Sequence, residues 1–183
     1  MNPLLQRLGF GPNDRVAIVH ADDIGAYQAS LPAIADLFEA GLVSSCATMV
    51  PCPWFPAVVA FARANPSADI GVHTTITSEY ELYRWGPVGP RDPASGLLDA
   101  DGYFHRSVAG VMAAAPEAVA AELRVQVERA LAAGIDVTHV DSHMGAVFIP
   151  AFLPGYLAAA EVPRVPAFLL RADAQQLRER GLP

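Results

Sequence analysis

The sequence predicts an α/β protein built around a parallel β-sheet. Short apolar runs alternate with helical segments along most of the 183 residues. Strands separated by helices in this rhythm usually pair in parallel, through right-handed crossovers. A second observation is that carboxylates and imidazoles gather where three of the apolar runs end. In α/β proteins, active sites are built at the carboxyl ends of the strands.

The first half of the chain contains three predicted strands and two predicted helices. The apolar run from Val16 to Val19 indicates the first strand, and Gly41 is suited to end the helix that follows it. Pro51 stops the second strand, and the turn at Pro66 follows the second helix. The expected elements are strands over 15–20, 44–50 and 69–76 and helices over 26–40 and 54–64.

The second half begins with a long segment, 78–115, that is rich in proline, glycine and aromatic residues. It exceeds the usual length of a connection, which indicates a lid, a binding loop or disorder. Pro116 begins the clearest helix, which Gly134 ends and whose apolar stripe is Val119, Leu123, Val127, Ala130 and Leu131. The remaining expected elements are a strand over 137–143, a helix over 150–160, a short strand over 167–170 and a helical turn from residue 173.

Composition excludes several classes of protein. A net charge of -7 argues against nucleic acid or an anionic membrane as a partner. No apolar run reaches the length of a membrane span, and the N-terminus lacks a secretory signal pattern. Cys46 and Cys52 fit no metal or redox motif, so we expect reduced thiols in a cytoplasmic protein. All 12 basic residues are arginine, which excludes a Schiff-base lysine or a P-loop lysine.

An acidic pair, Asp22 and Asp23, follows the first apolar run. Two adjacent carboxylates cannot easily be buried and ionised together without a cation or a shared proton. One of them could therefore bind a metal while the other transfers a proton. The alternative is that one caps a turn or helix and the other faces solvent.

Histidines close two further strands. His73 ends the third strand, where it is either a ligand or a hydrogen-bonded core residue. His139, Asp141 and His143 alternate along the fourth strand and should therefore face the same way. Such polar groups are costly in a core unless a metal or a hydrogen-bond network satisfies them, the alternative being an edge strand with a polar face. Carboxylate and imidazole together suit zinc and similar divalent metals.

The motifs around these residues resemble those of the YdjC/ChbG family of carbohydrate deacetylases. The matching segments are Val-His-Ala-Asp-Asp-Ile-Gly (19–25), Gly-Val-His-Thr-Thr-Ile-Thr (71–77) and Thr-His-Val-Asp-Ser-His (138–143). The resemblance implies a distorted (β/α) barrel and the metal-dependent removal of an N-acetyl group from an amino sugar or chitooligosaccharide. By motif position, it implies that Asp23, His73 and His143 are the metal ligands and that Asp22 is the catalytic base.

The chemistry of amide hydrolysis agrees with this assignment. One divalent ion, zinc or magnesium, would activate a water molecule and polarise the carbonyl, while Asp22 takes the water proton. We expect His143 on the metal, with Asp141 as an outer or substrate-contacting group and His139 as deeper support. Aromatic and polar groups suit a sugar, so Tyr83, Arg84 and Trp85 are candidate substrate contacts, unless they pack back on the barrel.

Two departures from the family affect this interpretation. Met144-Gly145-Ala146 follows the last motif in place of further histidine, and no histidine comes after His143. Only about five strands are predicted, whereas a closed barrel takes about 250 residues. We therefore expect one domain over residues 1–183 whose barrel is incomplete at the C-terminus. Its open edge would need cover, for example from a second copy in a homo-oligomer.

The same departures suggest a weak enzyme. We expect this chain to be a poor deacetylase and a version extending past Pro183 to be more active. If the general acid lies within the chain, His139 and His105 are the first candidates.

Two other classes of protein share part of this pattern. A receiver-type signalling domain also has an acidic pair after its first strand. It needs an aspartate at the end of its third strand, where this chain has His73, and a lysine after its fifth strand, whereas this chain has no lysine. A non-catalytic relative that keeps the metal and only binds sugar remains an open alternative.

Overall fold

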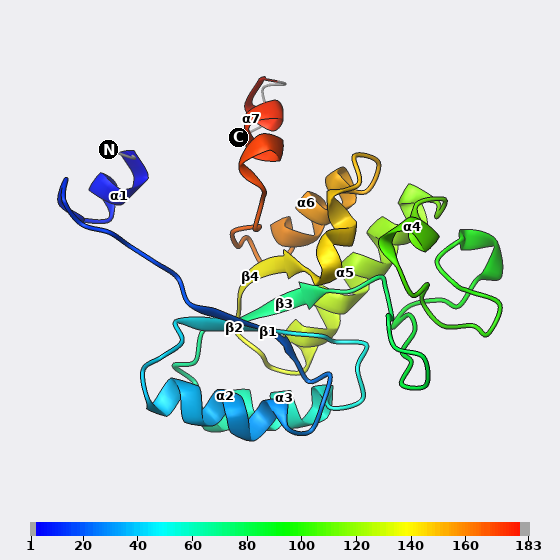
Figure 1. The fold of residues 1–183 in the computed structure, drawn as a ribbon, viewed down its shortest axis with the longest axis horizontal. Coiled ribbons are helices and arrows are strands. Elements are labelled where there is room, and N and C mark those ends of the chain that lie inside the picture. Colours follow the sequence, from blue (N-terminus) through cyan, green and yellow to red (C-terminus); the bar gives the residue numbers. More distant parts are fainter. Residues whose placement is uncertain (1–2, 180–183) are drawn as a thin grey trace.

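The computed structural model describes residues 3–179, and its centre is a four-stranded parallel sheet. The strands are β1 (His20–Ile24), β2 (Ser45–Thr48), β3 (Ile70–Thr74) and β4 (Val137–Ser142). They pair in the order of the sequence, β1-β2-β3-β4, and their carboxyl ends lie at one edge of the sheet (Figure 1). The predicted α/β class with a parallel sheet is confirmed.

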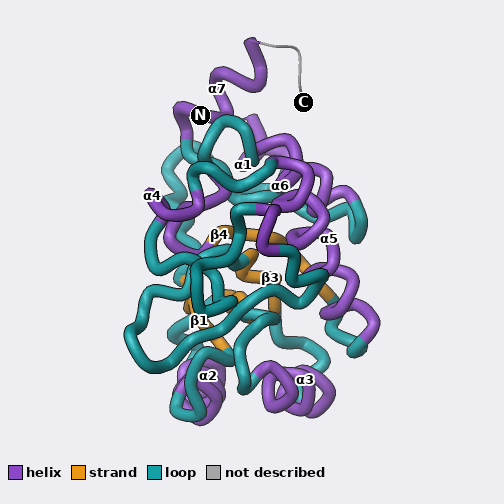
Figure 2. The backbone as a smooth tube through the Cα atoms, turned by 90° about the vertical axis from the view of Figure 1, so that its right-hand side faces the viewer, coloured by secondary structure: helices purple, strands orange, loops and turns teal. Residues whose placement is uncertain are grey.

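Helices cover the sheet in two groups. In both views, α2 and α3 lie side by side near β1 and β2, whereas α5 and α6 lie near β3 and β4 (Figures 1 and 2). The helices are α1 (Pro3–Arg7), α2 (Ser30–Glu39), α3 (Phe55–Ala64), α4 (Val108–Val111), α5 (Pro116–Ala132), α6 (Leu153–Glu161) and α7 (Arg171–Glu179). Two short 3-10 segments cover Pro93–Ser95 and His143–Phe148. Among the described residues, no helix has the length and apolarity that a membrane crossing requires.

The core lies between the sheet and these helices. All residues of β2 and β3 are buried, as expected for strands that are covered on both faces. The apolar stripe predicted for α5 is buried at Val119, Leu123, Val127 and Ala130. Helix α6 packs closely on α5 at Gly155, where an added Cβ would lie 2.6 Å from the Cβ of Ala120.

The prediction for the first strand was wrong in its position. The apolar residues before His20 are not part of the sheet, and Ile18 is 77% exposed. Pairing begins only where His20 lies opposite Ser45, because β2 starts there. Apolar character alone therefore placed the strand about five residues too early, and the acidic pair lies inside β1 rather than after it.

The predicted fifth strand over 167–170 is reduced to a single bridge between Ala167 and Val140. Two backbone hydrogen bonds join this segment to Val140 of β4. The Val140 N–H donates to the carbonyl of Pro166 at 3.0 Å, and the Phe168 N–H donates to the carbonyl of Val140 at 2.9 Å. Proline has no N–H to extend the ladder, and α7 begins at Arg171. The segment therefore follows the edge of β4 without becoming a strand of the sheet.

The long segment 78–115 is ordered against α5 at the carboxyl end of the sheet (Figure 1). The buried carboxylate of Glu122 accepts hydrogen bonds from the backbone N–H groups of Val88 and Gly89, at 3.0 and 2.8 Å. Gln126, one turn further along α5, donates to Glu122 at 2.8 Å. These buried polar side chains fix the segment beside the strand ends.

Candidate metal centre

A β-bulge in β1 places the acidic pair. Ala21 lies opposite Cys46 and Ile24 opposite Thr48, so β1 has one more residue than β2 over this stretch. A bulge bends the strand and redirects its side chains. At Asp23 the backbone has φ 59°, the left-handed region that costs a residue other than glycine about 1–3 kcal/mol. Such strain is concentrated at functional sites, where the surrounding structure holds it.

The bulge brings Asp23 to the two predicted histidine ligands. Asp23 Oδ1 lies 3.2 Å from His73 Nε2 and 2.9 Å from His143 Nδ1. One potential ligand atom from each residue lies within 4.8 Å of the others. Both histidines are buried, whereas the Asp23 side chain is 45% exposed and leaves an approach open.

In each imidazole, the outer nitrogen, which is the one that points away from Asp23, lies beside a second carboxylate. Asp141 Oδ1 lies 2.6 Å from His73 Nδ1, and Glu79 Oε2 lies 2.9 Å from His143 Nε2. In each ring, the second nitrogen faces Asp23. Metal-binding histidines usually have such a carboxylate partner, which fixes the tautomer and the orientation of the ring.

The electrostatics of the cluster favour a positive charge at its centre. Burial opposes the ionisation of Asp23, but hydrogen bonds with His143 and His73 outweigh it and hold the pKa of Asp23 below its usual range. Burial also opposes charge on His73, yet hydrogen bonds with Asp141 and Asp23 raise its pKa to about 9. The negative carboxylates therefore favour the protonated, positively charged form of the imidazoles. A divalent cation bound between these groups could supply the positive charge in place of those protons.

The donor set fits a divalent metal. One carboxylate and two imidazoles form the three-ligand set of many catalytic zinc sites, which leave further positions open for water and substrate. Asp23, His73 and His143 provide these groups from β1, β3 and the residue that follows β4. The backbone turns sharply after His143, with φ 53° at Met144 and φ 65° at Gly145, so the chain leaves the direction of β4 directly after His143.

Asp22 lies beside the cluster and is open to solvent. Its side chain is 61% exposed, and its Oδ1 lies 3.2 Å from His20 Nε2. Asp22 and His73 both line a cavity of about 610 Å³. An exposed carboxylate next to a metal ligand, at the wall of a cavity, can accept a proton from a bound water molecule.

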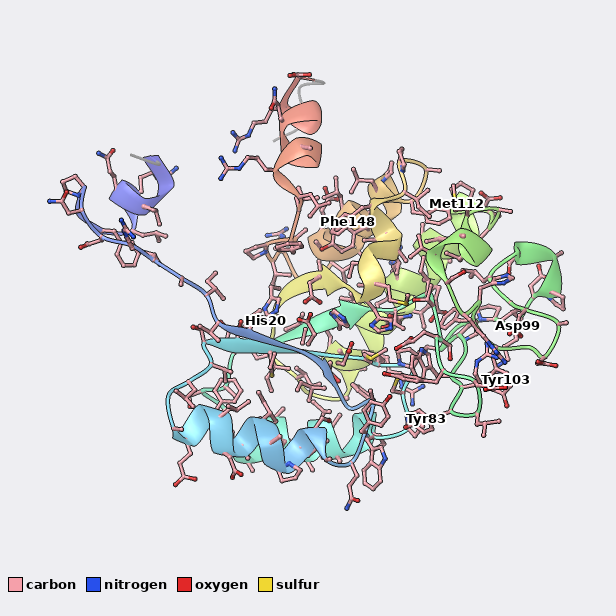
Figure 3. All side chains as sticks on the ribbon, viewed as in Figure 1. His20, Tyr83, Asp99, Tyr103, Met112 and Phe148 are labelled. Atoms are coloured by element: carbon pink, nitrogen blue, oxygen red, sulfur yellow. The ribbon has the colours of Figure 1, made fainter. Side chains whose placement is uncertain are left out.

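Arg84 and Trp85, which were candidate substrate contacts, are engaged within the protein. Arg84 forms an ion pair with Asp99 at 2.7 Å, and its side chain is only 6% exposed. The buried indole of Trp85 donates to the carbonyl of Thr77 at 2.7 Å. These contacts order segment 78–115, and Figure 3 shows Asp99 within it.

Tyr83, the third candidate substrate contact, belongs to a group of aromatic side chains near the site. Its hydroxyl donates to the carbonyl of Ala26 at 2.5 Å, and its ring stacks on Tyr27 with centroids 5.5 Å apart. Tyr27 also meets Tyr80 edge to face. Tyr27 and Tyr80 are about 40% exposed, so this aromatic group has an open side.

His139 and His105 lie away from the three ligands. Burial lowers the pKa of His139, whose ring packs over Gly71. His105 Nε2 lies 3.2 Å from the carbonyl oxygen of Gly96, within the long segment. Within residues 3–179, no hydrogen bond or ion pair joins either histidine to Asp23, His73 or His143, whereas Glu79, which sequence reasoning missed, lies 2.9 Å from His143 Nε2. The sequence indicates Glu79 only through its position a few residues after the end of β3.

Comparison with known proteins places the chain among sugar-modifying relatives. A carbohydrate deacetylase of Brevibacillus brevis is 36% identical over 149 residues, which are 81% of this chain and 57% of the relative. A carbohydrate deacetylase of Thermus thermophilus is 36% identical over 171 residues, 91% of this chain and 59% of the relative. The chain thus spans somewhat more than half the length of these relatives.

A solved structure shares the fold. A protein of Enterococcus faecalis, described as a candidate cellobiose-phosphate cleavage protein, superposes with a TM-score of 0.73 at 28% identity. The match covers 82% of this chain and 57% of that one. The family model for YdjC-like proteins matches residues 16–182, nearly the whole sequence. The chain therefore belongs to the YdjC-like family.

Proposed function

We propose that the protein is a metal-dependent hydrolase that removes the N-acetyl group from an amino sugar or chitooligosaccharide. The observation that carries the proposal is the convergence of Asp23, His73 and His143, with Asp22 beside them. The relatives named carbohydrate deacetylases support the substrate class.

Asp23, His73 and His143 would hold one divalent ion, zinc or magnesium. The chemistry supplied there is the activation of a water molecule and the polarisation of the acetyl carbonyl. Asp141 and Glu79 keep the imidazole rings oriented through their outer nitrogens.

Asp22 has the role of general base in this reaction. Its carboxylate takes a proton from the attacking water, whose oxygen bonds to the carbonyl carbon. The carbon–nitrogen bond then breaks as the nitrogen receives the proton that Asp22 took from the water, so the nitrogen leaves as an amine and Asp22 is again a carboxylate. The products are acetate and a free amino sugar.

The open aromatic group of Tyr27, Tyr80 and Tyr83 is suited to receive the sugar. Aromatic rings match the apolar faces of a pyranose, and the tyrosine hydroxyls can form hydrogen bonds with its hydroxyl groups. Segment 78–115 supplies two of the three rings at the carboxyl end of the sheet.

The test is to incubate the metal-loaded protein with N-acetylglucosamine oligomers and follow the loss of an acetyl group by mass spectrometry. The wild type should release acetate, and His143→Gln should not, because it removes a ligand. Sugar binding without any deacetylation would support the non-catalytic alternative and refute the proposed activity.

A further inference from the structure

A second cluster of metal-binding side chains lies beside the first. It consists of His20 on β1 and His139 and Asp141 on β4. One potential ligand atom from each lies within 4.8 Å of the others. The proposed hydrolysis assigns no role to His20 or His139.

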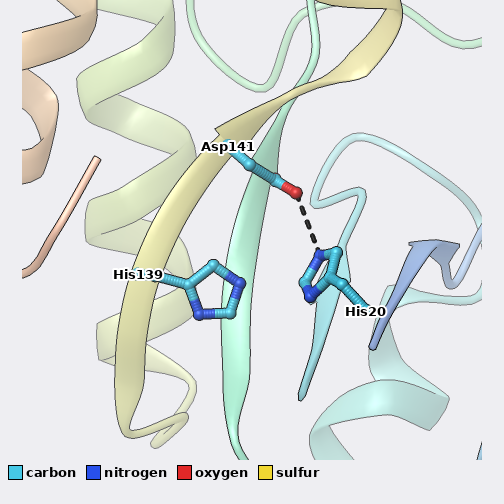
Figure 4. A group of neighbouring side chains, drawn as sticks. All are labelled: His20, His139 and Asp141. Atoms are coloured by element: carbon cyan, nitrogen blue, oxygen red, sulfur yellow. Dashed lines mark hydrogen bonds and ion pairs between the residues drawn. The ribbon is translucent and has the colours of Figure 1, made fainter. Parts of the chain in front are cut away.

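The three side chains point toward one another across β2 and β3 (Figure 4). His20 Nε2 lies 3.1 Å from Asp141 Oδ2, and the rings of His20 and His139 meet edge to face with centroids 5.0 Å apart. Their side chains are only 11–22% exposed, so the cluster is largely withdrawn from bulk water.

The hydrogen bonds of His139 leave one nitrogen free to coordinate. The Thr138 hydroxyl donates its proton to Asp69, so its oxygen accepts from His139 Nδ1, 2.9 Å away. With Nδ1 protonated, the neutral ring has its lone pair on Nε2. That atom is buried and has no hydrogen-bond partner among the described residues. A buried acceptor without a donor is unfavourable and calls for a ligand.

His20 is oriented in the same way. Its Nδ1 lies 2.7 Å from the Ser45 hydroxyl, which directs Nε2 to Asp141. A hydrogen bond to the outer nitrogen is the usual support for a metal-binding imidazole. A cation would replace the proton that His20 Nε2 shares with Asp141.

The fold makes room for this cluster. A Cβ on Gly71 would overlap the His139 ring, so only glycine allows the ring to lie over β3 at this point. The cavity of about 610 Å³ is lined by all three side chains and provides space for water or another ligand.

We propose that His20, His139 and Asp141 bind a second divalent cation, with zinc as the expected ion. Two imidazoles and one carboxylate suit zinc, and the adjoining cavity leaves a fourth position for water. Asp141 would serve both sites, because its Oδ2 faces His20 in the second cluster and its Oδ1 holds His73 of the first. The proposal is independent of the deacetylase activity.

The experiment counts bound zinc by equilibrium dialysis and metal analysis of purified protein. The wild type should bind two equivalents, whereas His20→Gln and His139→Gln should each bind one. His143→Gln should also bind one, and the double variant His139→Gln/His143→Gln none. His105→Gln is the matched control, because His105 meets neither cluster, and it should keep two equivalents. Circular dichroism checks that each variant is folded.

The outcomes separate the two sites. If the wild type binds one equivalent, which is lost in His143→Gln and kept in His20→Gln and His139→Gln, the second site does not exist and the first stands. If the wild type binds one equivalent that survives in His143→Gln but is lost in His139→Gln, the second site stands and the metal centre of the proposed function fails.

Discussion

At the scale of single residues, the site depends on the extra residue in β1. The bulge turns Asp23 toward His73 and His143 and leaves Asp22 exposed beside them. Two adjacent aspartates thus receive different environments. This difference is the basis for giving them different chemical roles.

Asp22→Asn should keep the metal and lose most turnover. The amide is nearly isosteric with the carboxylate, so the site should stay assembled, whereas loss of a general base typically costs 10²- to 10⁴-fold in rate. The measurement is kcat on an N-acetylated chitooligosaccharide together with metal content. Asp36→Asn, on the exposed face of α2, is the control and should change neither. Release of the metal by Asp22→Asn would instead assign Asp22 as a ligand.

Glu79→Gln should weaken metal binding. The Glu79 carboxylate orients His143 through its Nε2, and loss of such a partner typically costs 10- to 100-fold in metal affinity. A competition titration against a chelator measures this change. Glu81→Gln, two residues away and exposed, is the matched control. Equal affinities for the two variants would show that Glu79 does not support the site.

The ends of the apolar runs indicated the three segments that carry Asp23, His73 and His143, and the motif resemblance selected Asp23 rather than Asp22 as the ligand. Their role as ligands stays a proposal, but the structure brings them together. Glu79 could not be selected, since it lies in the long segment and nothing in the local spacing separates it from Glu81. Its position depends on how that segment packs against α5.

At the scale of elements, helix α5 both builds the core and anchors segment 78–115. Its apolar stripe was predictable from spacing, whereas the buried polar pair of Glu122 and Gln126 was not. Gln126 accepts from the N–H of Thr75 at 2.9 Å and donates to the Thr75 carbonyl at 2.7 Å, as a neighbouring strand would. Periodicity cannot indicate such partners, because they are fixed by tertiary packing.

The strand boundaries show the same limit. The run before His20 has strand-like composition but no strand to pair with, so β1 starts later than its apolar pattern indicates. The run after Pro166 has only the edge of β4 beside it and forms one bridge. Local composition identified both regions, and the available backbone partners decided how much of each became strand.

Glu122→Ala should destabilise the fold by about 2 kcal/mol. The change leaves the half-buried N–H groups of Val88 and Gly89 without their acceptor, and each such loss costs about 1 kcal/mol, the lower end of the range for a buried group. Urea denaturation measures the free energy of unfolding. Glu128→Ala on the same helix removes only an exposed pair with Arg124, worth about 0.3–0.5 kcal/mol. Equal losses in the two variants would contradict the anchoring role.

At the scale of the whole molecule, the sheet, the long segment and the candidate site share one end. The parallel strands deliver Asp23 and His73 to their carboxyl ends, β4 delivers His143, and segment 78–115 lies beside them (Figure 1). The sequence could predict this arrangement because parallel strands with helical crossovers bring their ends to one edge. In the proposed function, a cation held at this edge drives amide hydrolysis.

The most direct test is acetate release by one preparation of protein that is stripped of metal with a chelator and then reloaded. The stripped protein should release no acetate from an N-acetylglucosamine oligomer, and added zinc or magnesium should restore release in the wild type but not in His143→Gln. Acetate release that survives stripping, or that is restored equally in His143→Gln, would contradict the account, and so would a reloaded wild type that releases none.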